Sequence, residues 1–412
     1  MQTFPVDVIR RRFPAIVGNP ARVYMDNPAG TQVPATVADA VASAMTSASS
    51  NLGGFFPDSV AADATWLAGH EAGAELLGAA SHREIIVGQS MTALTFHMSR
   101  CLGPRFREGD EIVVTRMDHE GNVSPWLALA KDRGLTIRWL PFNRETFRIE
   151  PEDLAATLSG RTRLVALNFA SNLTGSINDV AHLVGMARAA GALTYVDAVQ
   201  MAPHAAIDVR AIGCDFLVCS AYKYFGPHLG VLYGREELLQ EIEAYKVRCA
   251  SNDLPGRFEM GTPQTELLAG LSAAVDYLAW IGEVNGVAGS RRAKIVGGFA
   301  ASTQYERQLS DRLIDGLRGL PGVTIHGIVN SNRFSERVPT VSFTHRQRGP
   351  EHVAKSLAAD GVCAWSGHNY AYEVVRHLNI DEAAGVVRIG MAHYNTLGEV
   401  DRTLAAVRRS LA

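Results

Sequence analysis

The feature that most constrains the fold is an alternation, between residues 84 and 235, of short β-branched runs with longer segments of helical period. This pattern is typical of a mostly parallel sheet covered by helices, because parallel neighbours need a long crossover connection. The predicted strands are residues 84–87, 111–115, 136–140, 164–169, 193–196, 216–219 and 231–233. We therefore expect an α/β fold whose large domain is built on these strands.

The rest of the chain predicts a smaller second domain, because 412 residues are too many for one ordinary hydrophobic core. After an irregular crossing at 251–263, the pattern predicts helices near 264–281, 293–318 and 351–359, strands near 322–327 and 338–344, and a final amphipathic helix to Leu411. We expect three parts: an N-terminal segment, 1–20, that packs with the small domain, a large domain, 21–285, and a small C-terminal domain, 286–412.

The composition favours a soluble enzyme with small-molecule ligands. The chain is 47% hydrophobic and 20% charged with a formal net charge of -3, which gives no reason to expect nucleic acid or a membrane as partner. Its five cysteines are irregularly spaced, so neither a disulfide framework nor a metal site is indicated. With no signal-peptide pattern and no run of about 18 uncharged apolar residues, we expect a cytoplasmic location.

Lys223 and Asp197 are the strongest chemical signal in the sequence. Lys223 follows the predicted strand 216–219, and Asp197 ends the predicted strand 193–196. Pyridoxal phosphate (PLP) needs an amine to hold its aldehyde as a Schiff base and an acid to keep its pyridine nitrogen protonated. The alternatives are a surface lysine and a helix N-cap. We expect a PLP site formed by this pair.

Other polar residues are expected around the same cofactor. Gln200, one turn beyond Asp197, can hydrogen-bond the phenolic oxygen, and the ring of His119 can stack on the pyridine. The phosphate needs hydrogen-bond donors, and the start of a predicted helix supplies free N–H groups. The expected phosphate contacts are Ser90, Met91, Thr92, Ser220 and Tyr222.

Asn172 and Arg388 are candidates for contacts with the substrate. Asn172 follows the strand 164–169 and can reach the phenolic oxygen or the substrate, with a simple turn residue as the alternative. Arg388 is a charge inside an apolar strand, where burial is unfavourable without an anion. A guanidinium suits a substrate carboxylate, whereas the alternative is an edge-strand arginine that faces water.

Taken together, these residues resemble class V aminotransferase-fold enzymes, and within them the cysteine desulfurase and selenocysteine lyase branch. The shared motifs lie at residues 24–30, 117–119, 171–175, 196–200, 220–223, 257–263, 366–368 and 394–396, and at Arg388. The resemblance implies PLP fold type I, with a mostly parallel seven-stranded sheet and a smaller C-terminal α/β domain. It implies Lys223 as the Schiff-base lysine and His119 as a catalytic residue on the ring. It also implies a homodimer with shared active sites, in which Thr262 reaches the partner subunit's phosphate.

The chain departs from this family pattern at two positions. Tyr222 stands where relatives usually have histidine, and Tyr370 stands where desulfurases carry the cysteine that accepts sulfur, two positions after His368. A phenol cannot replace a thiolate as sulfur acceptor. The pattern around Cys363 favours a buried strand residue. Persulfide-forming desulfuration is therefore disfavoured.

What remains is chemistry at Cα and Cβ of an amino acid, with Lys223 as general base once the substrate displaces it. The expected substrate contacts are Asn172, Arg388, Ala29, Trp365, His368 and Tyr370. Trp365 and Tyr370 can line a pocket for a bulky substituent, or pack between domains. The favoured reaction is C–S β-lysis of an S-substituted cysteine, in secondary metabolism. The alternatives are an epimerase, an aminotransferase or oxidative deaminase, a true cysteine desulfurase and a non-catalytic paralogue.

Overall fold

A seven-stranded sheet forms the centre of the larger part of the molecule. The computed structural model describes residues 4–47 and 49–412. The sheet has the order β2-β8-β7-β6-β5-β3-β4, in which β8 runs antiparallel to both of its neighbours and the pairs from β7 to β4 are parallel. Its strands are β2 (Ile85–Gly88), β3 (Glu111–Thr115), β4 (Thr136–Leu140), β5 (Thr162–Asn168), β6 (Leu193–Asp197), β7 (Phe216–Ser220) and β8 (Gly230–Gly234).

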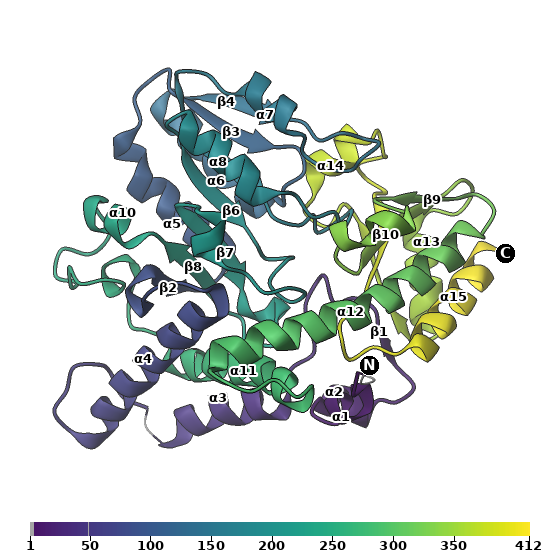
Figure 1. The fold of residues 1–412 in the computed structure, drawn as a ribbon, viewed down its shortest axis with the longest axis horizontal. Helices are drawn as coiled ribbons and strands as arrows, with labels where there is room; N and C mark the ends of the chain where they lie inside the picture. The colour runs from purple at the N-terminus through teal and green to yellow at the C-terminus, as the bar shows by residue number, and fades with distance from the viewer. Residues whose placement is uncertain (1–3, 48) are drawn as a thin grey trace.

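The strands are apolar on both sides because helices cover both faces of the sheet. Successive side chains of one strand enter different cores, so Val113 of β3 packs in one cluster and Ile112 in the other. Helices α5 and α6 cover one face, and α4, α8 and α11 contribute to the core of the other (Figure 1). The helices of this part are α3 (Ala35–Ser47), α4 (Pro57–Leu77), α5 (Met91–Leu102), α6 (Ser124–Arg133), α7 (Pro151–Thr157), α8 (Val180–Ala189), α9 (Val209–Ile212), α10 (Glu236–Glu241) and α11 (Thr265–Val284).

A second, four-stranded sheet with the order β12-β13-β10-β9 forms the smaller part, and all of its pairs are antiparallel. Figure 1 shows this sheet beside the large one, with the long helix α12 running between the two parts. The elements are α12 (Arg291–Arg318), β9 (Val323–His326), β10 (Thr340–His345), α13 (Pro350–Ala359), β11 (Val362–Cys363), β12 (Trp365–Gly367), α14 (Tyr372–His377), β13 (Val386–Gly390) and α15 (Leu397–Leu411).

The N-terminal residues connect the two parts. Helices α1 (Val6–Arg10) and α2 (Pro14–Gly18) precede β1 (Val23–Tyr24), which pairs in parallel with β11. Arg10 forms a 2.9 Å ion pair with Glu399 of α15, and the buried ring of Phe13 lies 5.4 Å from that of Tyr277 in α11. The division into parts 1–20, 21–285 and 286–412 stays a prediction.

Helix α11 is long and apolar enough, by length and composition, to cross a membrane. In this fold it packs against α3, α4 and α12. Leu268, Leu271 and Val275 of α11 are completely buried among apolar neighbours. These contacts are those of a core helix.

The predicted fold class is confirmed, and each predicted strand of the large sheet exists. The differences lie at strand ends. The strand expected at 164–169 begins at Thr162, whose pairing with Glu111 is followed by a register shift. The strand expected at 193–196 includes Asp197, because that residue pairs with Asn168 of β5. Ladder partners, which the sequence does not display, decide where these strands begin and end.

Candidate active site

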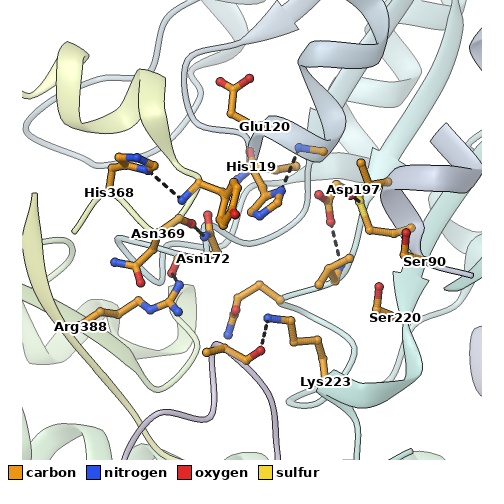
Figure 2. A pocket seen from close by; sticks show the side chains of 18 of the residues that line it. Ser90, His119, Glu120, Asn172, Asp197, Ser220, Lys223, His368, Asn369 and Arg388 are labelled. Carbon is orange, nitrogen blue, oxygen red and sulfur yellow. Dashed lines mark hydrogen bonds between the residues drawn. The ribbon is translucent and has the colours of Figure 1, made fainter. Parts of the chain in front are cut away.

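A cavity of about 900 Å³ lies where the carboxyl ends of β5, β6 and β7 meet the loops after β3 and β12. This is the edge of an α/β sheet where ligands are expected, because loops at strand ends leave a crevice there. All of the predicted site residues except Thr262 line it: Ala29, Ser90, Met91, Thr92, His119, Asn172, Asp197, Gln200, Ser220, Tyr222, Lys223, Trp365, His368, Tyr370 and Arg388. Figure 2 shows His119, Asp197 and Lys223 from the large sheet facing His368 and Arg388 from the smaller part across this cavity.

Lys223 lies in a short 3-10 turn that directly follows β7. Its Nζ atom donates hydrogen bonds to the carbonyl oxygens of Pro28, at 2.5 Å, and Ala29, at 3.0 Å. Burial, and then the positive charge of Arg388, lower the pKa of the amine to about 7, although Asp197 opposes both effects. A good part of this lysine is therefore an uncharged amine near neutral pH, as a nucleophile or a general base must be.

Asp197 ends β6 and is 5% exposed. Its Oδ1 atom accepts a 2.8 Å hydrogen bond from the backbone N–H of Val199. Burial raises the pKa of the carboxyl to about 6, although the Val199 hydrogen bond and Lys223 both act to lower it. A buried carboxylate with so little compensation suits a cationic partner such as a protonated pyridine nitrogen.

Unpartnered polar atoms in the cavity provide a test of whether PLP fits. In the part of the chain that the structure describes, Asn172 Oδ1, Gln200 Oε1 and Arg388 Nε are buried without a hydrogen-bond partner. Buried polar groups are normally paired, so these atoms indicate a polar ligand. The amide of Gln200 also donates through Nε2 to Thr340 at 3.1 Å. The residues present fit PLP.

The phosphate end of the cavity is formed by the start of α5. Ser90 is the N-cap of this helix, and its hydroxyl accepts a hydrogen bond from Ala93 N at 3.1 Å. The helix approaches β8 closely because residue 230 is glycine: a Cβ atom there would lie 2.4 Å from the carbonyl carbon of Ser90. Ser90, Met91 and Thr92, at the start of α5, line the cavity, so the N-terminus of this helix lies at the cavity, where an anion is favoured.

Arg388 lies in β13, between β12 and β10, and is 5% exposed. The alternative of an edge-strand arginine facing water is therefore wrong. Burial lowers the pKa of Arg388 to about 10, and Asp26 opposes this effect. The guanidinium donates to the backbone oxygen of Asn172 at 3.0 Å, and the Asn172 side chain donates to Asn369 O at 2.8 Å.

The loop after β12 closes the cavity with aromatic side chains. Asn369 and Tyr370 both have positive φ angles, 51° and 58°, which non-glycine residues rarely adopt. The backbone oxygen of Tyr370 accepts a 2.8 Å hydrogen bond from Glu120 N, and its ring lies 5.4 Å from that of His119. Trp365 and Tyr370 are 52% and 65% exposed, so they line the cavity instead of packing between domains.

Tyr222 and Thr262 differ from the expected arrangement. The ring of Tyr222 stacks on His228, with centroids 4.9 Å apart, and lies 4.8 Å from the Nζ atom of Lys223. The exposed residue Thr262 lies in a separate cavity of about 210 Å³, together with Gln89 and Glu259. It takes no part in the main cavity of its own chain, and its expected contact with a partner subunit's phosphate stays a prediction.

Sequence reasoning missed several cavity residues, among them Phe96 and Glu120. Phe96 lies one helical turn beyond Thr92, so the period of α5 could have identified it. Glu120 directly follows His119 and accepts a 2.5 Å hydrogen bond from Ser124. Cys363, predicted to be a buried strand residue, does lie in β11 but is half-buried.

Comparisons with known proteins agree with this geometry. The chain matches the family "Aminotransferase class-V" over residues 23–403. It is 31% identical to the "Aminotransferase-like protein FGM3" of Gibberella zeae, over 99% of both chains, and 30% identical to a cysteine desulfurase of Yersinia pestis, over 98% of both.

Two solved structures extend the likeness to the fold. A cysteine desulfurase, CsdA, from Escherichia coli superposes with a TM-score of 0.85 at 27% identity, covering 100% of this chain and 99% of the other. The apo cysteine desulfurase of Thermococcus onnurineus gives a TM-score of 0.88 at 27% identity, covering 99% and 98%. The chain therefore belongs to the class V aminotransferase family, as a cysteine desulfurase-like member of a family that uses PLP.

Proposed function

We propose that this enzyme is a C–S β-lyase that converts an S-substituted cysteine and water into a thiol, pyruvate and ammonium. In the overall change the Cα proton is removed, the Cβ–S bond breaks with its electron pair leaving on sulfur, and water replaces the amino group. Bound PLP supplies the electron-accepting ring that makes the Cα proton acidic. The protein's own residues bind the amino acid and move that proton.

One observation carries the proposal: in the described part of the chain, no cysteine is among the residues that line the cavity. A desulfurase must pass the substrate sulfur to a thiolate. Tyr370 lies at the position expected for that cysteine, and half-buried Cys363 is outside the cavity lining. Without an acceptor, sulfur leaves with its own substituent.

The cavity provides the groups that a β-lyase needs. Arg388 is a buried cation suited to the substrate carboxylate, and the lowered pKa of Lys223 provides a base for the Cα proton. A volume of about 900 Å³ is near the upper end for small-molecule sites, which leaves space beyond a cofactor and the cysteine backbone. Trp365 and Tyr370 line that space.

The test is to supply a panel of S-alkyl and S-aryl cysteines and free cysteine, and to measure thiol, pyruvate, alanine and keto acids. Thiol and pyruvate in equal amounts from the S-substituted substrates, abolished in Lys223→Ala, is the expected result. Alanine and enzyme-bound persulfide from free cysteine would instead indicate a desulfurase. Keto-acid formation coupled to amino-group transfer would indicate an aminotransferase.

The variant Tyr370→Cys tests the reason for the assignment. We expect it to give no steady production of alanine and persulfide, because a desulfurase needs a mobile loop around its cysteine. Here Asn369 and Tyr370 are held to the other part of the molecule by Asn172 and Glu120. Rapid desulfuration by this variant would show that the tyrosine alone blocks that reaction.

We also propose a homodimer with shared active sites. The exposed position of Thr262, away from the main cavity, supports this arrangement. Light scattering on the purified protein tests the dimer. Mixing inactive Lys223→Ala chains with Thr262→Ala chains tests the shared site, because exchanged subunits recover activity only if Thr262 acts across the interface.

A further inference from the structure

The imidazole of His119 accepts a hydrogen bond from its own loop. The backbone N–H of Gly121 donates to Nδ1 at 2.9 Å, so the ring is the N-cap of the 3-10 turn η3 (Glu120–Asn122). A backbone amide can only donate, which means that Nδ1 carries a lone pair and that Nε2 carries the proton of the neutral ring. In Figure 2 the bonded edge of this ring points away from Lys223.

Close packing around Gly121 holds this loop, and with it the hydrogen bond to His119, in place. A Cβ atom at Gly121 would lie 2.7 Å from Met91 Sδ, 2.8 Å from Thr92 Oγ1 and 3.0 Å from His119 Nδ1. The loop therefore packs directly on the start of α5. Asn122 fixes its other end through a 2.8 Å hydrogen bond to the completely buried Asp118.

The charged groups around the ring oppose a second proton. Arg388, in β13, is a cation that faces it across the cavity, as is the protonated form of Lys223, after β7, and the ring of Tyr370 packs 5.4 Å away. The neighbouring carboxylate of Glu120 is hydrogen-bonded to Ser124. Burial, then Lys223 and then Arg388 lower the pKa of His119 to about 4.

We propose that His119 is a fixed hydrogen-bond donor through Nε2–H, and that it does not accept a proton during the reaction. A neutral imidazole of this kind can polarise a group that gains negative charge, as an electrophile does. In the cavity it would act on the substrate or on the departing sulfur. This role in the reaction rests on the proposed function, and it leaves Lys223 as the base at Cα.

The assignment also separates the possible reactions. Epimerisation with a base on each face of Cα needs a second proton acceptor. The His119 ring offers no free nitrogen for this role, because Nε2 carries a proton and Nδ1 accepts the hydrogen bond from Gly121. β-Elimination needs one base and a leaving group that is stabilised as it departs. A single base and a fixed donor match β-elimination.

The direct test is the protonation state of the ring in the PLP-loaded enzyme labelled with ¹⁵N-histidine. Long-range ¹H–¹⁵N spectra of wild type and His119→Gln identify the two nitrogens, and His368→Gln, from the opposite side of the same cavity, is the matched control for assignment. We expect an unprotonated Nδ1 and a protonated Nε2 from about pH 6 to about pH 9. A proton on Nδ1 at about pH 7, in either the neutral or the charged ring, would overturn the proposal.

A second measurement follows the configuration at Cα of the bound amino acid. It does not depend on which S-substituted cysteine the enzyme accepts. In deuterated water, wild type is expected to exchange the Cα proton of bound L-amino acids with retention, forming no D-isomer. A D-isomer formed by wild type and lost in His119→Gln would identify His119 as a base and overturn the proposal. A failure to release thiol from any S-substituted cysteine would instead overturn the proposed function, and the ¹⁵N result would stand by itself.

The variant Gly121→Ala tests the cause of the fixed tautomer. Its Cβ displaces the His119 ring, so the hydrogen bond to Nδ1 weakens and the two neutral tautomers mix. We expect the ¹⁵N shifts of Nδ1 and Nε2 to move towards each other in this variant. Unchanged shifts in a folded Gly121→Ala protein would show that the Gly121 hydrogen bond does not set the tautomer.

Discussion

At the level of single residues, the buried amine of Lys223 makes stability depend on pH. Its pKa is lowered to about 7 in the fold, below the usual value for lysine, so between these values the unfolded chain binds more protons than the native protein. The contribution of Lys223 to the free energy of unfolding therefore rises with pH above about 7. For one proton the rise is at most about 1.4 kcal/mol per pH unit. Below pH 7 both states are protonated and the full penalty of burying the charge remains.

We expect Lys223→Met to remove this dependence in protein prepared without PLP. The variant should be more stable than wild type at pH 7, and its advantage should shrink as the pH rises towards about 10. Urea unfolding at several pH values measures the difference. Lys355→Met, at a highly exposed site, is the control and should follow wild type. An advantage that grows with pH would contradict the assignment.

Asp197→Asn tests the charge at the end of β6. The amide keeps the shape of the side chain but loses the negative charge that would hold a protonated ring nitrogen. A hydrogen bond to a charged group contributes about 1.5–3 kcal/mol, so kcat/KM should fall by about 10- to 100-fold. Steady-state kinetics measure the loss, and cofactor absorbance shows whether PLP stays bound. Full activity in this variant would mean that Asp197 does not contact the ring.

The residues that sequence reasoning found and those that it missed differ in one physical respect. Lys223 and Asp197 follow strands of the large sheet, and a strand end can be recognised from local composition. Glu120 and Phe96 reach the cavity through a 3-10 turn and a helix face, whose orientation depends on tertiary packing. Only indirect signals pointed to them: the period of α5 for Phe96, and the adjacent His119 for Glu120.

At the level of elements, the close contact between α5 and β8 positions the phosphate end of the cavity. We expect Gly230→Ala to destabilise the protein and to weaken PLP binding, because its Cβ would lie 2.7 Å from Met91 N and push the helix start away. Overpacking of this kind costs about 1–3 kcal/mol. Thermal unfolding and titration with PLP measure the two effects.

Gly185→Ala is the matched control for that change. Gly185 lies on the exposed side of α8, and a Cβ atom there would have no neighbouring atom within 4 Å. Alanine there should stabilise the helix by about 0.5–1 kcal/mol and leave PLP binding unchanged. Equal effects of the two substitutions would show that the α5–β8 contact has no special role.

At the scale of the whole molecule, the cavity exists because two parts of the chain are held together across it. Periodicity predicted the strands of the large sheet and two strands of the small one, yet no local pattern indicated how the loop at 365–371 meets the large sheet. Among the contacts that make that connection are those of Asn172 with Asn369 and of Glu120 with Tyr370, and an ion pair of Arg116 with Glu373. Each joins residues far apart in sequence, so only the folded chain reveals it.

The ion pair between Arg116 and Glu373 gives a test of this connection. Arg116 directly follows β3, and the carboxylate of Glu373, buried in α14, also binds Arg376 at 3.0 Å. We expect Glu373→Ala to loosen the loop that precedes α14, since the two arginines lose their partner. KM should rise about 10-fold or more with little change in PLP absorbance, because two of the expected substrate contacts, His368 and Tyr370, lie on that loop and the expected cofactor contacts do not. Glu351→Ala, which breaks an exposed ion pair with Lys355, should leave KM unchanged. Faster proteolytic cleavage near residue 370 in Glu373→Ala alone would locate the effect, whereas an unchanged KM would show that the loop keeps its position without this ion pair.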